Sequence, residues 1–200
     1  MRYPVPWVTQ YASPSLIEAI AYRDHPRGDD PRWRESGAPD QDTYAAWCWR
    51  WCGIACFRMA LLARDGVAPS LYELALGAEE YGAYVDEPDR PRGLIYRPFA
   101  EYARDKHSMG AEVITELEPA RLTAELDAGR LVIASVSSQI RLPDAEPTRT
   151  GGHLVLVTGH ADGLVTFHDP AGHTPEAGVA TLPMPVFDRF AAHRGVALHL

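Results

Sequence analysis

Apolar side chains recur at helical spacing through the first half of the chain. The clearest run follows Cys52, where Ile54, Phe57 and Leu61 fall on one face of a single helix. Gly66 comes directly after this run, and glycine suits the left-handed residue that ends many helices. We therefore expect a central helix that begins at Cys52 and ends just before Gly66.

Two capping boxes predict further helix starts. In each, a serine is followed three residues later by a glutamate, a pair that can satisfy two free backbone N–H groups. These boxes are Ser15 with Glu18, opening a short helix, and Ser70 with Glu73, opening a helix through about residue 81. Apolar spacing also predicts helices over residues 96–106, 118–129 and 186–193.

The second half of the chain has the pattern of strands. Leu131–Val136 is a continuous apolar run, and the runs His153–Thr158 and Leu164–His168 flank a turn at residues 159–163. Weaker strand patterns cover residues 111–115, 178–182 and 196–200. Helices followed by an antiparallel sheet indicate an α+β fold, and we expect residues 1–200 to form one domain.

Polar, proline-bearing stretches interrupt these elements. Arg23–Asp42 is charged, with Trp33 as its one anchor, and Ser138–Gly152 runs directly into His153. A further charged connection covers residues 85–93. Loops of such length are usually lids, binding loops or solvated insertions. We expect the first two to border the functional site, with little apolar burial in Arg23–Asp42.

The composition excludes several classes of protein. Hydrophobic residues make up 46% of the 200 residues, enough for a sizeable core. The formal net charge of −8 argues against a nucleic-acid or anionic-membrane surface. No apolar run could span a bilayer, and the first ten residues lack the apolar core of a signal peptide. Three cysteines within nine residues do not form a disulfide framework, so we expect a cytoplasmic protein.

Cys52 is the candidate nucleophile. It stands at the expected N-terminus of the central helix, where free backbone N–H groups and the helix dipole favour an anion. A cysteine there is biased toward the thiolate, which is the nucleophilic form. The alternative is a buried structural cysteine beside Trp47, Trp49 and Trp51.

His153 and Asp169 are the candidate partners of Cys52. A cysteine nucleophile needs a base, and the base needs a group that orients it. His153 starts one strand directly after two glycines, and Asp169 ends the next strand. If the strands pair as a hairpin, both residues lie at the same end of the sheet, where the carboxylate could hold the imidazole. A purely structural His–Asp pair is the alternative.

The spacing of the cysteines and histidines argues against a metal site. Structural zinc normally uses two separated pairs of ligands, whereas Cys48, Cys52 and Cys56 recur every four residues. Three histidines close in sequence also lack a zinc-peptidase spacing: His160, His168 and His173. We expect no metal and no cofactor, with Cys48 before the central helix and Cys56 in the core.

Four segments resemble one known family. Cys52-Gly-Ile-Ala and its apolar helix are similar to the nucleophile helix of papain-like cysteine peptidases of the bacteriocin-processing, double-glycine type and their stand-alone relatives. Gly152-His153 resembles the family's Gly-His strand, and His168-Asp169-Pro170 resembles its Asp-Pro segment. Val5–Gln10 resembles the segment that carries its oxyanion glutamine. Ile54 stands where the family usually has proline.

The resemblance implies a papain-like fold and assigns a role to each of these residues. Cys52 would be the nucleophile, His153 the general base and acid, and Asp169 the orienting residue. Gln10 and the backbone N–H of Cys52 would stabilise the oxyanion. Gln41 is closer to Cys52 in sequence and is a rival for the role of Gln10.

The implied reaction is hydrolysis of a peptide or other amide bond through a thioester. An acyl transferase or cyclase would use the same residues with an amine in place of water. A papain-like binding module without turnover is a third reading, because a fold does not fix a reaction. The expected partner is a peptide or small amide substrate, with no nucleic acid and no membrane, and the oligomeric state stays open.

Overall fold

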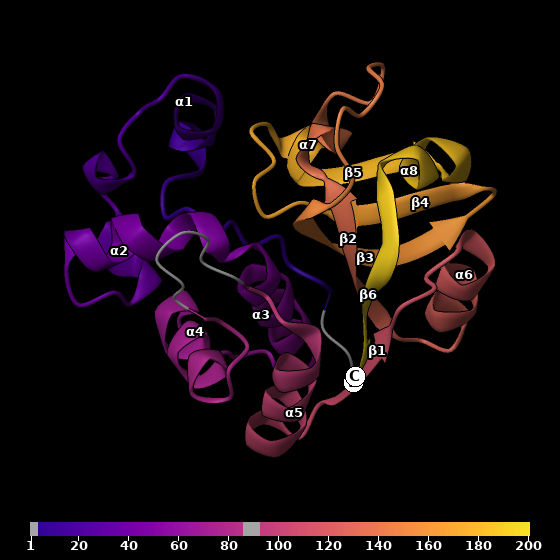
Figure 1. Cartoon of the computed structure of the whole chain (residues 1–200), viewed down its shortest axis with the longest axis horizontal. Coiled ribbons are helices and arrows are strands. Elements are labelled where there is room, and N and C mark those ends of the chain that lie inside the picture. Colours follow the sequence, from indigo (N-terminus) through magenta and orange to yellow (C-terminus); the bar gives the residue numbers. More distant parts are fainter. Residues whose placement is uncertain (1–3, 86–92) are drawn as a thin grey trace.

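The first half of the chain is helical, and the second half contains the strands (Figure 1). The structure is a computed structural model that describes residues 4–85 and 93–200. The first-half helices are α1 (Ile17–Tyr22), α2 (Gln41–Trp47), α3 (Cys52–Asp65), α4 (Leu71–Glu80) and α5 (Tyr96–His107). Short 3-10 helices lie between them: η1 (Pro14–Leu16), η2 (Arg27–Asp29), η3 (Trp33–Ser36) and η4 (Cys48–Arg50). The connection expected over residues 85–93 falls mostly outside the described residues.

The described part of the second half forms a six-stranded antiparallel sheet with the order β1-β6-β2-β3-β4-β5. Its strands are β1 (Gly110–Ile114), β2 (Leu131–Ser137), β3 (Gly152–Ala161), β4 (Leu164–His168), β5 (Val179–Pro183) and β6 (Ala191–His199). The connections carry α6 (Pro119–Asp127), η5 (Ser138–Arg141), α7 (Pro175–Gly178) and α8 (Met184–Phe190). The expected α+β class is confirmed, and β6 is longer than the strand expected at residues 196–200.

The sheet separates two apolar clusters because successive residues of a strand point to opposite faces. In β3, Leu154 and Leu156 pack with the residues of α3, whereas Val155 and Val157 pack on the other face. The second face is covered by α8 and α6. The central helix α3 is therefore buried against the sheet, and its first turn lies close to the start of β3.

Gly53 explains how closely α3 approaches β3. A Cβ atom at this position would lie 2.8 Å from Cδ1 of Leu154 and 2.9 Å from Cδ2 of Leu94. Contacts that short would force the neighbouring side chains to move. Glycine at the second position of α3 thus allows Cys52 to come near the strand residue that precedes Leu154.

The stretch Arg23–Asp42 is not the solvated loop that its composition indicates. Asp30 is fully buried and accepts hydrogen bonds from Ser13 N at 3.0 Å, Ser13 Oγ at 2.6 Å and Tyr44 Oη at 2.6 Å. Its carboxylate also accepts from Arg32 N at 3.0 Å. This buried polar network ties the stretch to the residues before α1 and to α2, so the part around Asp30 is not a solvated insertion.

Other local predictions differ in detail. Ser70 and Glu73 form the expected capping box of α4. Ser15 does not cap a helix, because it lies inside η1 and α1 begins two residues later. The helix α2 was not expected, and its N-cap is Asp40, whose carboxylate accepts a hydrogen bond from Thr43 N at 2.7 Å. Among the described helices, none is long and apolar enough to cross a membrane.

Candidate active site

Cys52 is the first residue of α3 and is partly exposed. The helical turns before it are broken into α2 and η4, so the three cysteines do not share one continuous helix. Cys48 lies in η4 and Cys56 inside α3, and both are fully buried. Burial raises the pKa of Cys48 to about 12 and that of Cys56 well above its ordinary value. Cys52 is therefore the one cysteine of the three that solvent can reach.

The hairpin of β3 and β4 brings His153 and Asp169 to the same end of the sheet. Leu156 pairs with His168, so the residues just before Leu156 and just after His168 lie close together. Gly152 precedes His153 and has a φ of +90°, a conformation that favours glycine. Both candidate side chains are buried, His153 with 6% and Asp169 with 0% of the residue exposed.

His153 contacts Asp169, and Cys52 lies nearby on α3. Nε2 of His153 is 2.6 Å from Oδ1 of Asp169. Gly53, the residue after Cys52, packs against Leu154, the residue after His153, and the Cys52 side chain contributes to the raised pKa of His153. Oδ1 of Asp169 also accepts a hydrogen bond from Ala171 N at 2.7 Å, so the carboxylate is held from the backbone as well. The structure thus brings all three sequence candidates into one cluster.

The charges in this cluster set the protonation of both partners. Burial alone would raise the pKa of Asp169, but the charges of His153 and Arg141 and their hydrogen bonds hold it well below its ordinary range. Burial lowers the pKa of His153 and Arg141 opposes its protonation, yet Asp169 outweighs both and the pKa is raised. Asp169 is therefore ionised, and His153 is poised to take a proton.

Arg141 completes the cluster, and sequence reasoning did not identify it. It ends η5 and its side chain is 6% exposed. Nε donates to Oδ2 of Asp169 at 2.8 Å, and Nη2 lies 3.4 Å from Oδ1 of Asp169 and 2.9 Å from Nε2 of His153. The sequence shows only that an arginine precedes the Gly-His strand by a few residues, and this is too common a feature to indicate a functional residue.

The N-terminal segment crosses to the sheet beside the cluster. Gln10 is 3% exposed, its backbone N donates to Pro170 O at 2.8 Å, and its side-chain Nε2 donates to Cys48 O at 3.0 Å. Trp7 Nε1 donates to Asp169 O at 2.8 Å. Gln41, the rival candidate, is exposed in α2 and its side chain donates to Gly28 O. Gln10 therefore lies in the segment that joins the helical half to Asp169, and Gln41 does not.

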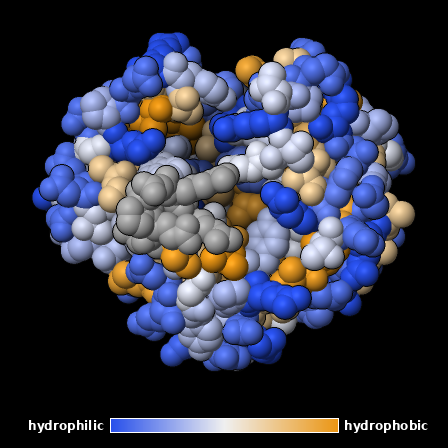
Figure 2. All heavy atoms as spheres, viewed as in Figure 1, coloured by the Kyte–Doolittle hydropathy of each residue, from blue (hydrophilic) through white to orange (hydrophobic). Residues whose placement is uncertain are grey.

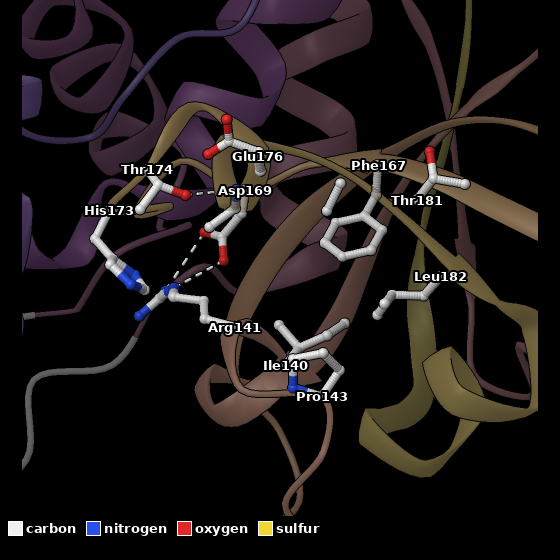
Figure 3. A pocket seen from close by; sticks show the side chains of 12 residues that line it. Ile140, Arg141, Pro143, Phe167, Asp169, His173, Thr174, Glu176, Thr181 and Leu182 are labelled. Atoms are coloured by element: carbon white, nitrogen blue, oxygen red, sulfur yellow. Dashed lines mark hydrogen bonds and ion pairs between the residues drawn. The ribbon is translucent and has the colours of Figure 1, made fainter.

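A pocket of about 270 Å³ opens on the β5 side of Asp169 and Arg141. Figure 3 shows the Arg141 guanidinium and the Asp169 carboxylate facing each other at one end, with Phe167 and Leu182 on the far side. Figure 2 shows that the face of the molecule seen in Figure 1 is hollowed between the helical half and the sheet half. The cluster lies at the junction of the two halves, because Cys52 begins α3 whereas His153 and Asp169 belong to the hairpin of β3 and β4.

One group of described side chains has the composition of a cation site. Glu118, Asp188 and His193 place possible ligand atoms within 4.8 Å of one another. They already pair among themselves, with His193 Nε2 3.0 Å from Asp188 Oδ1 and His193 Nδ1 3.4 Å from Glu118 Oε1. None of the three cysteines belongs to this group.

Comparisons with known proteins agree with this architecture. Residues 32–193 match the model of the Peptidase_C39 like family. The peptidase domain of Streptococcus ComA, a bifunctional ABC transporter involved in a quorum-sensing pathway, has a similar structure, with a TM-score of 0.51 and 17% identity over 74% of this chain and 90% of that domain. A C39-like protein from Bacillus anthracis has a TM-score of 0.51 and 16% identity over 76% of this chain and 89% of its own. No curated protein has significant sequence similarity to the chain.

Proposed function

Since this chain belongs to the Peptidase_C39 like family and has the papain-like fold of a cysteine peptidase, we propose that Cys52, His153 and Asp169 are its catalytic triad. The observation that carries the proposal is the position of His153. Its Nε2 bonds Asp169 at 2.6 Å, and the residue after it, Leu154, packs against Gly53 in the first turn of the helix that Cys52 begins. This position supports His153 as the base between an orienting carboxylate and a nearby nucleophile.

The acylation step follows from these contacts. The bond to Asp169 occupies Nε2, which leaves Nδ1 of His153 to take the proton of the Cys52 thiol. The thiolate attacks the carbonyl carbon of the scissile amide and forms a tetrahedral oxyanion. As the carbon–nitrogen bond breaks, the imidazolium gives its proton to the leaving amine, and a thioester with Cys52 remains.

The oxyanion would be stabilised from two directions. Cys52 is the first residue of α3, so its backbone N–H has no partner within the helix. Gln10 Nε2 carries two N–H groups, and the bond to Cys48 O uses one of them. We assign the second N–H of Gln10 and the backbone N–H of Cys52 to the oxyanion.

Hydrolysis of the thioester reverses these roles. His153 takes a proton from water, the resulting hydroxide attacks the thioester carbon, and Cys52 leaves as thiolate and is reprotonated. The substrate class is a peptide or another amide, and the net charge of −8 argues against nucleic acid as a partner. Because the segment Trp7–Gln10 bonds Asp169 and Pro170, we also propose that the whole chain acts as one catalytic unit.

The test combines labelling with turnover. Limited iodoacetamide followed by peptide mapping should modify Cys52 before Cys48 and Cys56, which are buried and have raised pKa values. Intact mass spectrometry with a short-peptide library should reveal an acyl adduct on Cys52, and added hydroxylamine should release it as a hydroxamate.

The matched variants are Cys52→Ala and Cys56→Ala, four residues apart in the same helix. Cys52→Ala should abolish both the adduct and turnover, whereas Cys56→Ala should keep them. Labelling of Cys48 or Cys56 with Cys52 inert would falsify the assignment of the nucleophile. An adduct that amines discharge and water does not would make the protein an acyl transferase.

A further inference from the structure

Arg141 makes a set of contacts with the proposed triad that a structural ion pair would not need. Its Nε donates to Oδ2 of Asp169 at 2.8 Å, while Nη2 is shared between Oδ1 of Asp169 at 3.4 Å and Nε2 of His153 at 2.9 Å. Burial of the guanidinium, whose side chain is 6% exposed, makes these contacts strong. The guanidinium therefore touches both groups on which the state of the base depends.

Two contacts compete for one atom of His153. Arginine has only donors, so Nε2 could accept from Arg141 only if it carried no proton. Without that proton, a lone pair of Nε2 would face a carboxylate oxygen of Asp169 at 2.6 Å, which is repulsive. The proton therefore lies on Nε2 and is donated to Asp169. The other ring nitrogen, Nδ1, then has the lone pair that a base needs.

The positive charge of Arg141 acts on this arrangement in two ways. Two N–H groups of the guanidinium reach the two oxygens of Asp169 and fix the plane of the carboxylate. Nη2 also places a positive charge 2.9 Å from Nε2, and this charge opposes an imidazolium in the same place. A proton taken by His153 is therefore released more readily to the leaving amine.

We propose, on the basis of the function assigned above, that Arg141 is a positioning residue of the reaction. It holds Asp169 in the orientation that keeps the proton on Nε2 of His153, and its charge favours return of the catalytic proton. It touches no substrate atom in this role and acts through the other two residues.

The charged and titratable groups around His153 come from four parts of the molecule. Cys52 is on α3, Asp169 follows β4, and Arg141 ends η5. Tyr22 of α1 lies near the Arg141 side chain and contributes to its raised pKa. Cys56, near Asp169, stays neutral because burial raises its pKa. Among these neighbours, Arg141 carries the one permanent positive charge, so its removal should change the titration of His153.

The experiment compares Arg141→Met, Arg141→Lys and the control Arg149→Met across pH. Arg149 lies in the same loop, and its guanidinium bonds Ser138 Oγ away from the triad. The rate of Cys52 alkylation and the kcat and KM for a peptide substrate are measured for each variant. The ¹⁵N signals of the His153 ring, assigned by their loss in His153→Ala, give its titration and its tautomer without any substrate.

Arg141→Met should lower kcat at least tenfold with little change in KM. It should also move the ascending, acid limb of the pH profile and the titration of His153 to higher pH, because the base must be neutral to act and loses the charge that opposes its protonation. Arg141→Lys should bring this limb of the pH profile and the pKa of His153 back toward the wild-type values, because lysine restores the positive charge. It should leave kcat low, because it cannot restore the two-pronged bond to Asp169. Arg149→Met should behave as wild type.

The proposal would be overturned if Arg141→Met folds and neither the pH profile of kcat nor the pKa of His153 differs from wild type. Arg141 would then only form a structural ion pair with Asp169. If Arg141→Met does not fold, the comparison of Arg141→Lys with wild type decides. An unchanged kcat in Arg141→Lys would then refute the positioning role. Failure of the proposed function would look different, because wild-type Cys52 would itself be inert to iodoacetamide.

Discussion

Gln10 is fixed at both its backbone and its side chain, which is the arrangement expected of a residue that must hold a transition-state charge. Its backbone N donates to Pro170 O at 2.8 Å and its Nε2 donates to Cys48 O at 3.0 Å. A preorganised donor is effective because it need not reorient when the oxyanion forms. The buried position of Gln10 and the exposed position of Gln41 make the two glutamines separable by experiment.

Gln10→Ala should therefore lower kcat for a peptide substrate roughly 100- to 1,000-fold, as loss of one oxyanion donor does, with a smaller change in KM. Gln41→Ala is the matched control, because it removes an exposed amide from α2, and it should leave kcat unchanged. Steady-state kinetics on the two purified variants make the comparison. A loss of kcat in Gln41→Ala, with Gln10→Ala near wild type, would transfer the role to Gln41.

At the scale of single residues, the sequence indicated the groups that belong to motifs and missed those that depend on tertiary contact. Cys52, His153 and Asp169 could be proposed from the sequence because each lies at or next to the end of an element whose pattern is strong. Arg141 could not, because its contacts depend on η5 turning its guanidinium toward the hairpin of β3 and β4. Asp30 was missed for the same reason, since its partners are spread over Ser13, Arg32 and Tyr44.

The short helices η2 and η3 are important for stability because they hold Asp30 between them. Its carboxylate receives four hydrogen bonds while fully buried. Removal of such an acceptor leaves buried donors without partners, which is costly. This part of the chain should therefore stabilise the helical half and not merely border a cleft.

Asp30→Ala should lower the free energy of unfolding by about 2 kcal/mol or more, because Ser13 and Tyr44 lose a shared buried partner. Urea unfolding followed by circular dichroism gives the value. Asp29→Ala, which changes the exposed neighbouring carboxylate in η2, should change stability far less. Equal stability of the Asp30→Ala protein and wild type would show that the Asp30 network does not stabilise the helical half.

Long elements with a strong apolar pattern were predicted well, and short elements were not. The helix from Cys52 to Asp65 and the strand from Leu164 to His168 match the expected ranges. The seven-residue helix α2 was missed because its stability comes from contacts with η2, η3 and η4, which no local pattern shows. β6 was expected at residues 196–200 and begins at residue 191, directly after α8.

For the whole molecule, buried ionisable groups make stability depend on pH. Asp30 and Asp169 have pKa values below the ordinary range, Asp30 because hydrogen bonds from Ser13 and Tyr44 outweigh its burial. Each contributes stability that is present above a pH of about 4 and lost as the pH falls through its folded value. His168 acts in the same direction, because burial lowers its pKa and it must be neutral in the folded state. His153, with a raised pKa, contributes stability that is lost as the pH rises.

The free energy of unfolding should therefore fall steeply below a pH of about 4, where protonation of Asp30 and Asp169 removes their contributions. Between a pH of about 4 and about 7 the contributions of His168 and His153 oppose each other. Urea unfolding at a series of pH values measures this curve. Asp30→Asn should flatten its acid limb, since the variant has one fewer carboxylate to protonate. An acid limb that is as steep in Asp30→Asn as in wild type would show that Asp30 gives no pH-dependent stability.

The position of β6 has a consequence for the order in which the molecule can assemble during translation. β6 lies between β1 and β2, although both of those strands leave the ribosome long before residues 191–199. Until then β1 and β2 have no native partner on the edges that will face β6, and the apolar run Leu131–Ser137 can pair with a neighbouring nascent chain. A chain that ends after β5 should therefore expose the β2 edge and aggregate, and it should not fold as a smaller protein.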